Sequence, residues 1–452
     1  MNRIASRGGI VVILALILAI GFGLFVAEFV MKSDSWIVKP GSPHVFNGEN
    51  LNCGVIVDSR GILLLDMQEN RKYSSNAQIR KSTVHWLGDR YGKINAPALA
   101  AYADEMVGYD LVNGVYAYSD TVGVSEMTID SRIQTAALEA LGNHKGTVAV
   151  YNYKTGQILC AVTTPTYDPD SVPEDIESYD GAYWNRFTQS AYIPGSIFKT
   201  VTLAAALESM ENARDWTYFC TGSCELGSDK ITCEVAHGSQ SLKTAFTNSC
   251  NCAFATLAQE LGADTLNSYV QKFGVIEPVQ FDGIVTASGA YTVTEEPVFL
   301  GLGAIGQHED QINPCAFMVY MGAVANGGKA TMPYLIQEVR AGEELTYRAQ
   351  RATGERIMSK ETAQTVQEYM RNNVSQKYGD WNFPGLSVCA KTGTAEVGGE
   401  QKPNAMFTGF VDDEKYPLAF IVCVEDGGYG STVCIPIASK VLETCKTVLD
   451  EG

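Results

Sequence analysis

The first feature of the hydrophobic pattern is a long stretch near the N-terminus that lacks charged side chains. Residues 8–27 form twenty such positions, rich in Ile, Leu and Val, and Arg3 and Arg7 precede them. A helix of this length spans the apolar part of a bilayer. The arginines before it and Glu28 after it predict a cytoplasmic N-terminus and an exported remainder. A cleaved signal peptide is the competing interpretation, but the run exceeds a usual signal core and no convincing Ala-x-Ala site follows.

Later in the chain, apolar runs have the length and spacing of strands. Two of them are separated by a short turn with glycine and predict a hairpin, and three more precede a helical pattern at 438–450. Together they predict a five-stranded antiparallel sheet with helices on both faces. The five runs are 148–153, 157–162, 386–397, 405–411 and 417–425.

A possible nucleophile stands where a polar segment meets an apolar helical run. The segment 194–200 reads Pro-Gly-Ser-Ile-Phe-Lys-Thr and the run follows at 201–207. If a helix starts here, Ser196 and Lys199 lie on one face, because residues three apart are neighbours on a helix. A hydroxyl would then lie beside an amine that can act as its base. Taken alone, the same pattern is also what a capped helix start looks like.

Two later motifs favour the chemical interpretation. Ser-Cys-Asn at 249–251 lies between two helical patterns, and Lys-Thr-Gly-Thr at 391–394 lies in a strand pattern. Ser-x-x-Lys, a Ser-x-Asn type triplet and Lys-Thr-Gly form the signature set of penicillin-binding proteins and class A β-lactamases. With all three in this order, the chain resembles the class B penicillin-binding proteins. The resemblance covers residues from about 127 onward closely and implies an α+β fold with a transpeptidase/β-lactamase-like domain.

The resemblance implies a role for each residue that matches a motif. Ser196 is expected to attack the substrate carbonyl after Lys199 has taken its proton. A proton would pass through Ser249 to the leaving amine, and Asn251 would hold the substrate peptide. The expected catalytic residues are Ser196, Lys199 and Ser249, and the expected substrate-binding residues are Asn251, Lys391, Thr392, Gly393 and Thr394.

The strand that carries the third motif suits a peptide substrate. An edge strand can bind a peptide as an added strand, and Gly393 permits a close approach of backbones. A charge on Lys391 would disfavour protonation of Lys199, because like charges repel. Thr394 is a candidate for two contacts. Its hydroxyl would bind the substrate carboxylate, and its N–H would form an oxyanion hole with that of Ser196.

The function implied by the resemblance is that of a peptidoglycan D,D-transpeptidase in cell-wall synthesis. Such an enzyme cross-links stem peptides, and β-lactams acylate its serine because they imitate the D-Ala-D-Ala terminus. No metal or organic cofactor is expected for this reaction. A membrane-embedded glycan polymerase is the expected protein partner. The expected organisation is a cytoplasmic N-terminus with a transmembrane anchor at 1–33, a non-catalytic pedestal module at 34–127 and a transpeptidase domain at 128–452.

Net charge and cysteine content bear on two further questions, the kind of partner and the state of the thiols. The formal net charge of −18 argues against nucleic acid as a partner. Twelve cysteines are unusual for an exported chain, because an oxidising exterior would pair them. Four residues form a C-x3-C-x8-C-x3-H pattern that fits a zinc site, a disulfide such as Cys220 to Cys233, or free thiols. They are Cys220, Cys224, Cys233 and His237.

Other functions remain open from the sequence. A D,D-carboxypeptidase carries the same motifs, but that group is typically anchored at the C-terminus, where this chain has a soluble helical pattern. A β-lactamase would be smaller and would need a group that activates water. A membrane-tethered β-lactam sensor or a non-catalytic scaffold belongs to a different class. Asn251 argues against the sensor, whose triplet lacks Asn, and the filled catalytic positions argue against the scaffold.

Overall fold

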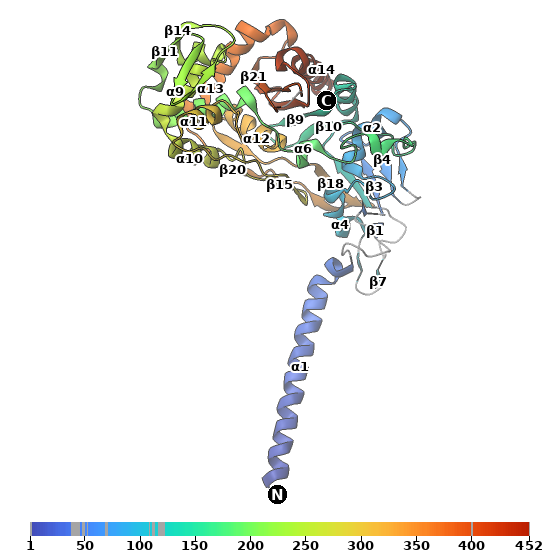
Figure 1. Ribbon diagram of the computed structural model, residues 1–452. Coiled ribbons are helices and arrows are strands. Elements are labelled where there is room, and N and C mark those ends of the chain that lie inside the picture. Colours follow the sequence, from blue (N-terminus) through green and yellow to red (C-terminus); the bar gives the residue numbers. More distant parts are fainter. Residues whose placement is uncertain are drawn as a thin grey trace.

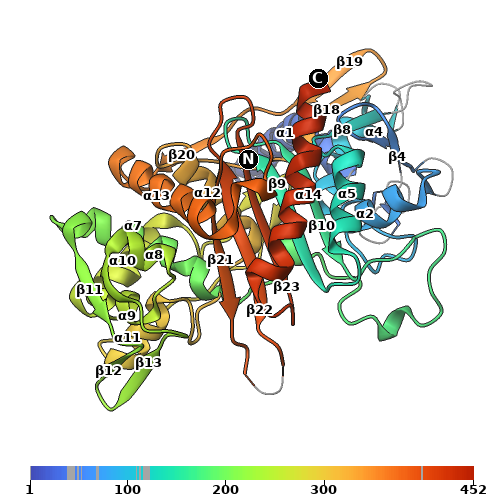
Figure 2. The same ribbon diagram turned by 90° about the horizontal axis from the view of Figure 1, so that it is seen from above.

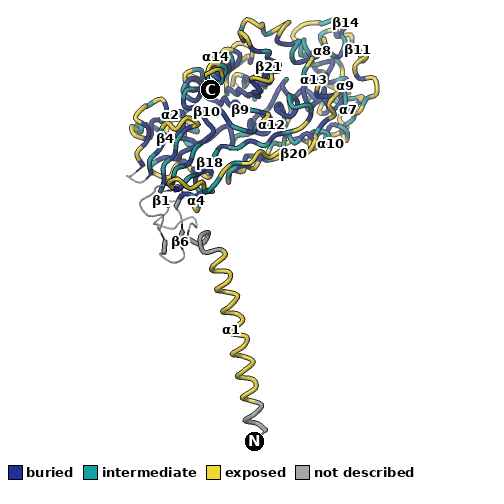
Figure 3. Tube along the Cα trace, turned by 180° about the vertical axis from the view of Figure 1, so that it is seen from behind, coloured by how far each residue is buried: buried dark blue, intermediate teal, exposed yellow. Residues whose placement is uncertain are grey.

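The N-terminal apolar segment forms one long helix, α1 (Asn2–Ile37), which extends away from the folded body (Figure 1). Its stretch Arg7–Met31 is long and apolar enough to cross a membrane, and all of its side chains are exposed (Figure 3). This helix fits the predicted single-pass membrane anchor. The structure is a computed structural model, and it describes residues 2–37, 46–47, 50–51, 53–67, 71–107, 109–110, 114–115, 123–398 and 401–451.

A five-stranded antiparallel sheet forms the centre of the body, with the strand order β10-β9-β23-β22-β21. Ile421 on β23 lies opposite Ala149 on β9, so the last strands of the chain lie beside the first strands of this sheet. The predicted antiparallel sheet is therefore confirmed, and β21, which carries Lys391, is its edge. The strands are β9 (Gly146–Asn152), β10 (Ile158–Thr164), β21 (Val388–Ala395), β22 (Asn404–Val411) and β23 (Leu418–Val424).

Helices cover both faces of this sheet. Along β9, Val148 and Val150 belong to one core, whereas Ala149 and Tyr151 belong to the other, as the alternation of side chains along a strand requires. Because both faces are buried, the strands are continuous apolar runs instead of alternating ones. The helices are α5 (Ser131–Leu141) and α14 (Gly430–Glu451) on one face and α12 (Pro314–Ala325) on the other.

A mainly helical lobe stands beside the β21 edge of the sheet (Figure 2). Its first helix, α7 (Lys199–Ser209), is buried over its first two turns, where small Ala side chains let other helices approach closely. The 3-10 turn η2 (Gly195–Phe198) leads into α7 and packs against β21. The other helices are α8 (Leu242–Thr247), α9 (Asn251–Leu261), α10 (Ala263–Phe273), α11 (Pro297–Ala304) and α13 (Lys360–Asn373).

The N-terminal part of the body is built on a six-stranded mixed sheet with the order β19-β18-β8-β3-β4-β5. Arg80 on α2 donates two hydrogen bonds to Asp168, at 2.7 and 2.6 Å, and ties this part to the rest of the body. The elements are β3 (Val55–Val57), β4 (Leu63–Asp66), β5 (Lys72–Tyr73), α2 (Ala77–Leu87), β8 (Gly123–Met127), β18 (Ile336–Ala341) and β19 (Glu344–Arg348).

Two strands of this sheet, β18 and β19, come from the segment that the sequence assigns to the transpeptidase domain. The N-terminal part is thus completed by residues from much later in the chain. The division at 33 and 127 stays a prediction.

Short elements connect these layers. The short helices and turns are α3 (Pro97–Ala100), α4 (Ala103–Val107), α6 (Arg186–Gln189), η1 (Ile176–Ser178), η3 (Ala213–Asp215), η4 (Val374–Tyr378) and η5 (Asp380–Asn382). The short strands are β1 (Phe46–Asn47), β2 (Asn50–Leu51), β6 (Tyr109–Asp110), β7 (Gly114–Val115), β11 (Thr217–Cys220), β12 (Ser223–Leu226), β13 (Asp229–Thr232), β14 (Gly238–Ser241), β15 (Gln280–Phe281), β16 (Ile284–Val285), β17 (Lys329–Thr331) and β20 (Thr353–Arg356).

Candidate active site

Ser196 lies in the 3-10 turn η2, and the regular helix that the sequence predicts begins only at Lys199. Gly195 has a φ of +54°, and a Cβ at this position would lie 2.5 Å from the backbone oxygen of Thr394. Its N–H also donates to the backbone oxygen of Gly306 at 2.8 Å. The turn is therefore packed between β21 and the end of α11. The side chain of Ser196 stays partly exposed.

The amine of Lys199 is buried directly beneath this serine. Its Nζ lies 3.1 Å from Ser196 Oγ and also donates to Ser249 O and Asn251 Oδ1, both at 2.7 Å. Burial lowers the pKa of Lys199 to about 7, because the ammonium form loses its hydration. Near neutral pH much of this amine is unprotonated, so it can accept the proton of the neighbouring hydroxyl.

Ser249 connects the two lysines of the site. Its Oγ accepts hydrogen bonds from Lys199 at 3.2 Å and from Lys391 at 3.0 Å. Its φ of +52° is uncommon for a residue other than glycine, and such strained residues cluster at functional sites. The loop lies between α8 and α9, as predicted. Asn251 Nδ2 donates to Thr232 O at 3.0 Å, which leaves Oδ1 facing Lys199.

Lys391 is buried on the edge strand β21. Its amine donates to Ser249 Oγ and to Thr392 O, the latter at 2.9 Å. Burial, and next the charge of Lys199, lower the pKa of Lys391 well below its ordinary value. Burial is the main cause of the lowered pKa of both amines, and the charge of Lys199 further lowers the pKa of Lys391. The effect that the sequence predicts in the other direction, from Lys391 on Lys199, stays a prediction.

Two contacts fix the rest of the third motif. Tyr378 Oη accepts the N–H of Thr392 at 3.1 Å and shares a hydrogen bond with its Oγ1 at 3.0 Å. A Cβ on Gly393 would lie 2.8 Å from Pro194 O and 3.0 Å from Ile197 Cγ2. The close approach expected at Gly393 is therefore made by the nucleophile turn of the same chain.

An open cleft of about 590 Å³ lies over these groups. Residues from all three motifs line it, together with β13, the segment after β13 and Tyr429. Lys199, Lys391 and Gly393 are buried beneath its surface. The predicted site residues that line the cleft are Ser196, Ser249, Asn251, Thr392 and Thr394.

Sequence reasoning missed three residues that hold the motifs in place. They are Tyr378, Asn373 and Thr232, and all lie outside the motifs. Asn373 Nδ2 donates to Ala390 O at 3.1 Å, next to Lys391. No short pattern marks these positions. Only the packing of α13 and η4 against β21, and of β13 beside α9, brings them to the site.

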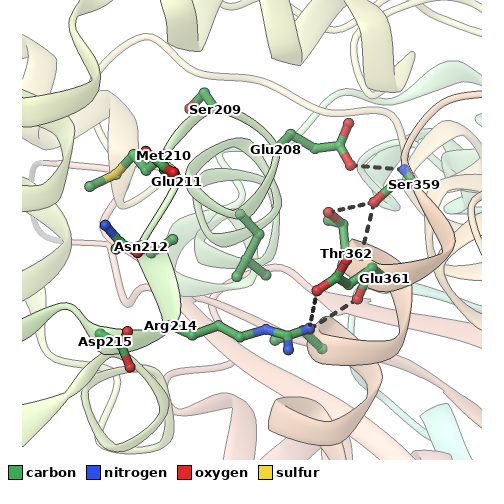
Figure 4. A pocket seen from close by; sticks show the side chains of 13 residues that line it. Glu208, Ser209, Met210, Glu211, Asn212, Arg214, Asp215, Ser359, Glu361 and Thr362 are labelled. Atoms are coloured by element: carbon green, nitrogen blue, oxygen red, sulfur yellow. Dashed lines mark hydrogen bonds and ion pairs between the residues drawn. The ribbon is translucent and has the colours of Figure 1, made fainter.

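A second pocket of about 550 Å³ lies at the other end of α7 (Figure 4). Three of the charged side chains that line it have polar partners. Glu208 Oε1 accepts the N–H of Ser359 at 2.8 Å, and Arg214 lies 3.3 Å from Glu361. At ~1.5 Å of rise per residue, Glu208 is roughly 14 Å along α7 from Lys199. Among the described residues that line it, none belongs to the three motifs.

The cysteines and the histidine that lie close together in the structure are not the same four residues that the sequence spacing suggests. The side-chain ligand atoms of Cys220, Cys233, His237 and Cys250 all lie within 4.8 Å of one another. Cys224 lies outside this group. All twelve cysteines are free thiols, and the sulfurs of Cys220 and Cys233 are 3.9 Å apart, so this disulfide is not formed in the structure. A hydrogen bond from Cys250 lowers the pKa of the Cys233 thiol below its ordinary value.

Comparison with known proteins agrees with this geometry. A family model described as the penicillin binding protein transpeptidase domain matches residues 146–443, a range that contains all three motifs. The chain belongs to this family. The match makes it an enzyme of the serine acyltransferase type, and the α+β fold expected from the resemblance is confirmed.

Three relatives illustrate the similarity. Peptidoglycan D,D-transpeptidase PbpA of Mycobacterium tuberculosis is 29% identical over 360 residues, which are 71% of this chain and 72% of that protein. Stage V sporulation protein D of Bacillus subtilis is 27% identical over 412 residues, 85% of this chain and 60% of that protein. The structure of penicillin-binding protein A from M. tuberculosis as a ceftriaxone acyl-enzyme has a TM-score of 0.75 and 25% identity, and covers 87% of this chain and 98% of that one.

Proposed function

We propose that this protein is a peptidoglycan D,D-transpeptidase that works through an acyl-enzyme on Ser196. One observation carries the assignment of the residues. The buried amine of Lys199 lies 3.1 Å from Ser196 Oγ, with a pKa of about 7, and Ser249 connects it to Lys391. The relatives that bear the name peptidoglycan D,D-transpeptidase support the choice of substrate.

In the acylation step, Lys199 takes the proton of Ser196 and Oγ attacks the carbonyl carbon between the two D-alanines of a stem peptide. The C–N bond then breaks. The proton held by Lys199 passes through the Ser249 hydroxyl to the leaving nitrogen, which departs as free D-alanine. The hydrogen bonds that join Lys199, Ser249 and Lys391 provide the path for this proton.

In the second step, the amine of a neighbouring stem peptide attacks the ester carbonyl. The new amide bond forms the cross-link, the bond to Ser196 Oγ breaks, and the proton of the amine returns to this oxygen through Lys199. Each cycle therefore replaces one peptide bond with another and uses no cofactor. β-Lactams complete only the first step on Ser196, since their opened ring stays bonded to the serine.

Substrate binding is assigned to the cleft side of β21. Thr392 and Thr394 line the cleft together with Ser196, and their hydroxyls would contact the terminal carboxylate of the stem peptide. When the buried amine of Lys391 is protonated, its positive charge stabilises this carboxylate. The N–H groups of Ser196 and Thr394 would hold the oxyanion. Asn251, fixed by Thr232, presents its amide at the same cleft.

The apolar helix α1 supports a membrane location. We place its N-terminus in the cytoplasm, because Arg3 and Arg7 precede the span, and the catalytic domain outside. The exposed apolar surface of α1 would then also be available to a membrane-embedded glycan polymerase, which is the partner we propose.

A product assay tests this function against the carboxypeptidase alternative. Full-length protein in detergent micelles would be given a stem pentapeptide donor, with and without an amine acceptor from a second stem peptide. The proposal predicts a cross-linked dimer and released D-alanine from wild type, and neither from Ser196→Ala. Release of D-alanine with tetrapeptide as the only product, whether or not acceptor is present, would instead identify a D,D-carboxypeptidase.

A further inference from the structure

A hollow of about 550 Å³ lies at the end of the central sheet where the chain passes from β21 to β22, and it has no part in the chemistry above. Distant parts of the chain meet here. The lining residues come from 180–192, 397–404 and 425–426, with Lys145 beside them. A cavity of this size is typical of a site for a small ligand.

The positive charges of the hollow are already compensated. Lys145 Nζ lies 2.8 Å from Glu425 Oε2 and also contacts Asp180. Arg186 Nε donates to Glu425 Oε1 at 2.8 Å, and its other two nitrogens donate to the backbone oxygens of Gly181 and Asp180. These are the two cations among the described residues that line the hollow. A phosphate or carboxylate ligand would therefore find no free cation to pair with.

Three side-chain amides at the hollow have hydrogen-bonding capacity left over. Gln189 Oε1 accepts the N–H of Asn185 at 2.8 Å, and Asn404 Oδ1 accepts the N–H of Asp426 at 3.2 Å. Within the part of the chain that the structure describes, no hydrogen bond uses the NH₂ group of either side chain or the amide of Gln401. An amide both donates and accepts hydrogen bonds, which suits hydroxyl and acetamido groups.

A fixed aromatic ring lines the same hollow. Trp184 is 48% exposed, and its Nε1 donates to Ser190 Oγ at 3.0 Å. Because this hydrogen bond holds the indole and satisfies its polar group, the ring offers a ligand its apolar face. Tryptophan side chains of this kind, apolar on the face and polar at the edge, are enriched at binding surfaces.

An aromatic face beside uncharged amides fits a neutral sugar. A sugar ring has an apolar C–H face, which packs on an aromatic ring, and a rim of hydroxyl groups, which bind amides and carboxylates. The carboxylate of Asp426, which also lines the hollow, can accept such hydroxyl groups. A purely apolar ligand would leave the amides without partners, which is unfavourable.

The hollow lies where the proposed substrate would bring a sugar. Glu396 lines the catalytic cleft, and the next residue, Val397, lines the hollow. A stem peptide added antiparallel to β21, with its carboxylate toward Thr392, has its N-terminal end toward Val397. Four extended residues span roughly 13–14 Å, and the strand from Thr394 to Val397 spans about 10 Å. The sugar attached to the N-terminal end of the peptide would therefore reach the hollow.

We propose that this hollow binds the glycan part of the donor substrate, an N-acetylated amino sugar. Trp184 stacks against the sugar ring, and Gln189, Gln401 and Asn404 bind its hydroxyl and acetamido groups. This inference rests on the proposed function, because the peptidoglycan stem peptide is what connects the catalytic cleft to a sugar. The hollow adds binding energy for the substrate and takes no part in acyl transfer.

Ligand-observed NMR on the full-length protein tests the site without catalysis. The probe is the disaccharide N-acetylglucosaminyl-N-acetylmuramic acid with its carboxyl group capped as an amide, in a detergent without a sugar head group. Saturation transfer to the ring protons should occur with wild type and be lost with Trp184→Ala and Gln401→Ala. Trp381→Ala is the matched control, because Trp381 is 82% exposed but does not line the hollow, and it should keep the signal. No transfer from wild type, or undiminished transfer from Trp184→Ala, would overturn the proposal.

Kinetics with two donors gives a second readout. Release of D-alanine would be compared for the free stem pentapeptide and for the same peptide attached to its disaccharide. The disaccharide donor should have a KM lower by about three- to tenfold in wild type, the contribution of one stacked ring, and Trp184→Ala should lose this difference. A folding defect would affect both donors alike, so the ratio of the two KM values reports on the sugar site.

The outcomes separate this inference from the proposed function. Equal KM values in wild type, or a ratio that Trp184→Ala leaves unchanged, would overturn the sugar site while transpeptidation stands. Binding of the disaccharide through Trp184 without turnover of either donor would support the sugar site and remove the proposed function.

Discussion

Lys199 holds Ser249 through two atoms of the serine at once. Its amine donates to the backbone oxygen of Ser249 at 2.7 Å and to the side-chain oxygen at 3.2 Å. The φ of +52° at Ser249 accompanies this arrangement, in which both oxygens face the amine. The base and the middle motif therefore form one structural unit, and a change in either residue should disturb the other.

The pKa of Lys199 predicts how acylation depends on pH. A buried lysine with a lowered pKa of about 7 loses its proton as pH rises through that value, and only the neutral amine can accept the serine proton. The second-order rate constant for acylation by a β-lactam should rise about tenfold per pH unit below the midpoint and level off above it. Stopped-flow measurements on full-length protein would check this.

The matched variant for this experiment is Lys199→Arg. Arginine carries the same charge as a protonated lysine but does not lose its proton in proteins. The variant therefore cannot accept the proton of Ser196 and should lose acylation at every pH. A wild-type rate that is flat across the range, or an arginine variant that still reacts, would remove Lys199 from the role of base.

Two substitutions at Ser249 separate chemistry from backbone strain. Ser249→Ala and Ser249→Gly both remove the hydroxyl that contacts the two lysines, so both should slow acylation by about 10²-fold or more. Glycine adopts a positive φ freely, so Ser249→Gly should be more stable to unfolding than Ser249→Ala by about 1 kcal/mol. Acylation kinetics and thermal unfolding would be measured in parallel. Equal stability of the two variants would argue against strain at this residue.

Gly393→Ala should damage the site by moving two backbones apart. The added Cβ would lie 2.8 Å from Pro194 O, so β21 and the nucleophile turn must separate. Overpacking of this kind costs about 1–3 kcal/mol of stability. A misplacement of the turn should lower the acylation rate by about 10²-fold. The control is Gly354→Ala, where the nearest atom would be 3.6 Å away, and it should react like wild type. Normal acylation by Gly393→Ala would contradict the close packing.

Tyr378→Phe tests a positioning residue that has no motif. The substitution removes the hydroxyl that holds both the N–H and the Oγ1 of Thr392, at a cost of about 1–3 kcal/mol in stability. Acylation should slow, while the pH midpoint set by Lys199 stays in place. Tyr416→Phe loses a comparable hydrogen bond, to Asp450, away from the cleft and should leave the rate unchanged. A shifted pH midpoint in Tyr378→Phe would show that the tyrosine acts on Lys199 and not on β21.

The sequence predicts the sheet and the motifs well for a physical reason. Strands buried on both faces are continuous apolar runs, so β9, β10, β22 and β23 stand out, and the three motifs are local patterns in which neighbouring residues act together. The exact start of α7 was missed, because the 3-10 turn at Ser196 depends on contacts of Gly195 with Thr394 and Gly306.

Contacts between distant segments explain what the sequence does not reveal. Tyr378 and Thr232 reach the site only through tertiary packing, and no local pattern distinguishes them from other Tyr and Thr residues. The cysteine pattern shows the same limit. Spacing suggests Cys224 because it is close along the chain, whereas the fold brings Cys250 to the cluster from the N-terminus of α9.

Trapping the acyl-enzyme tests the central claim most directly. Full-length protein in detergent would be incubated with a fluorescent penicillin, then digested and analysed by mass spectrometry to locate the adduct, with Ser196→Ala treated in parallel. The account predicts one adduct per wild-type chain, on the peptide that contains Ser196, and none on the folded variant. An adduct on another residue, or no adduct on well-folded wild type, would contradict Ser196 as the nucleophile.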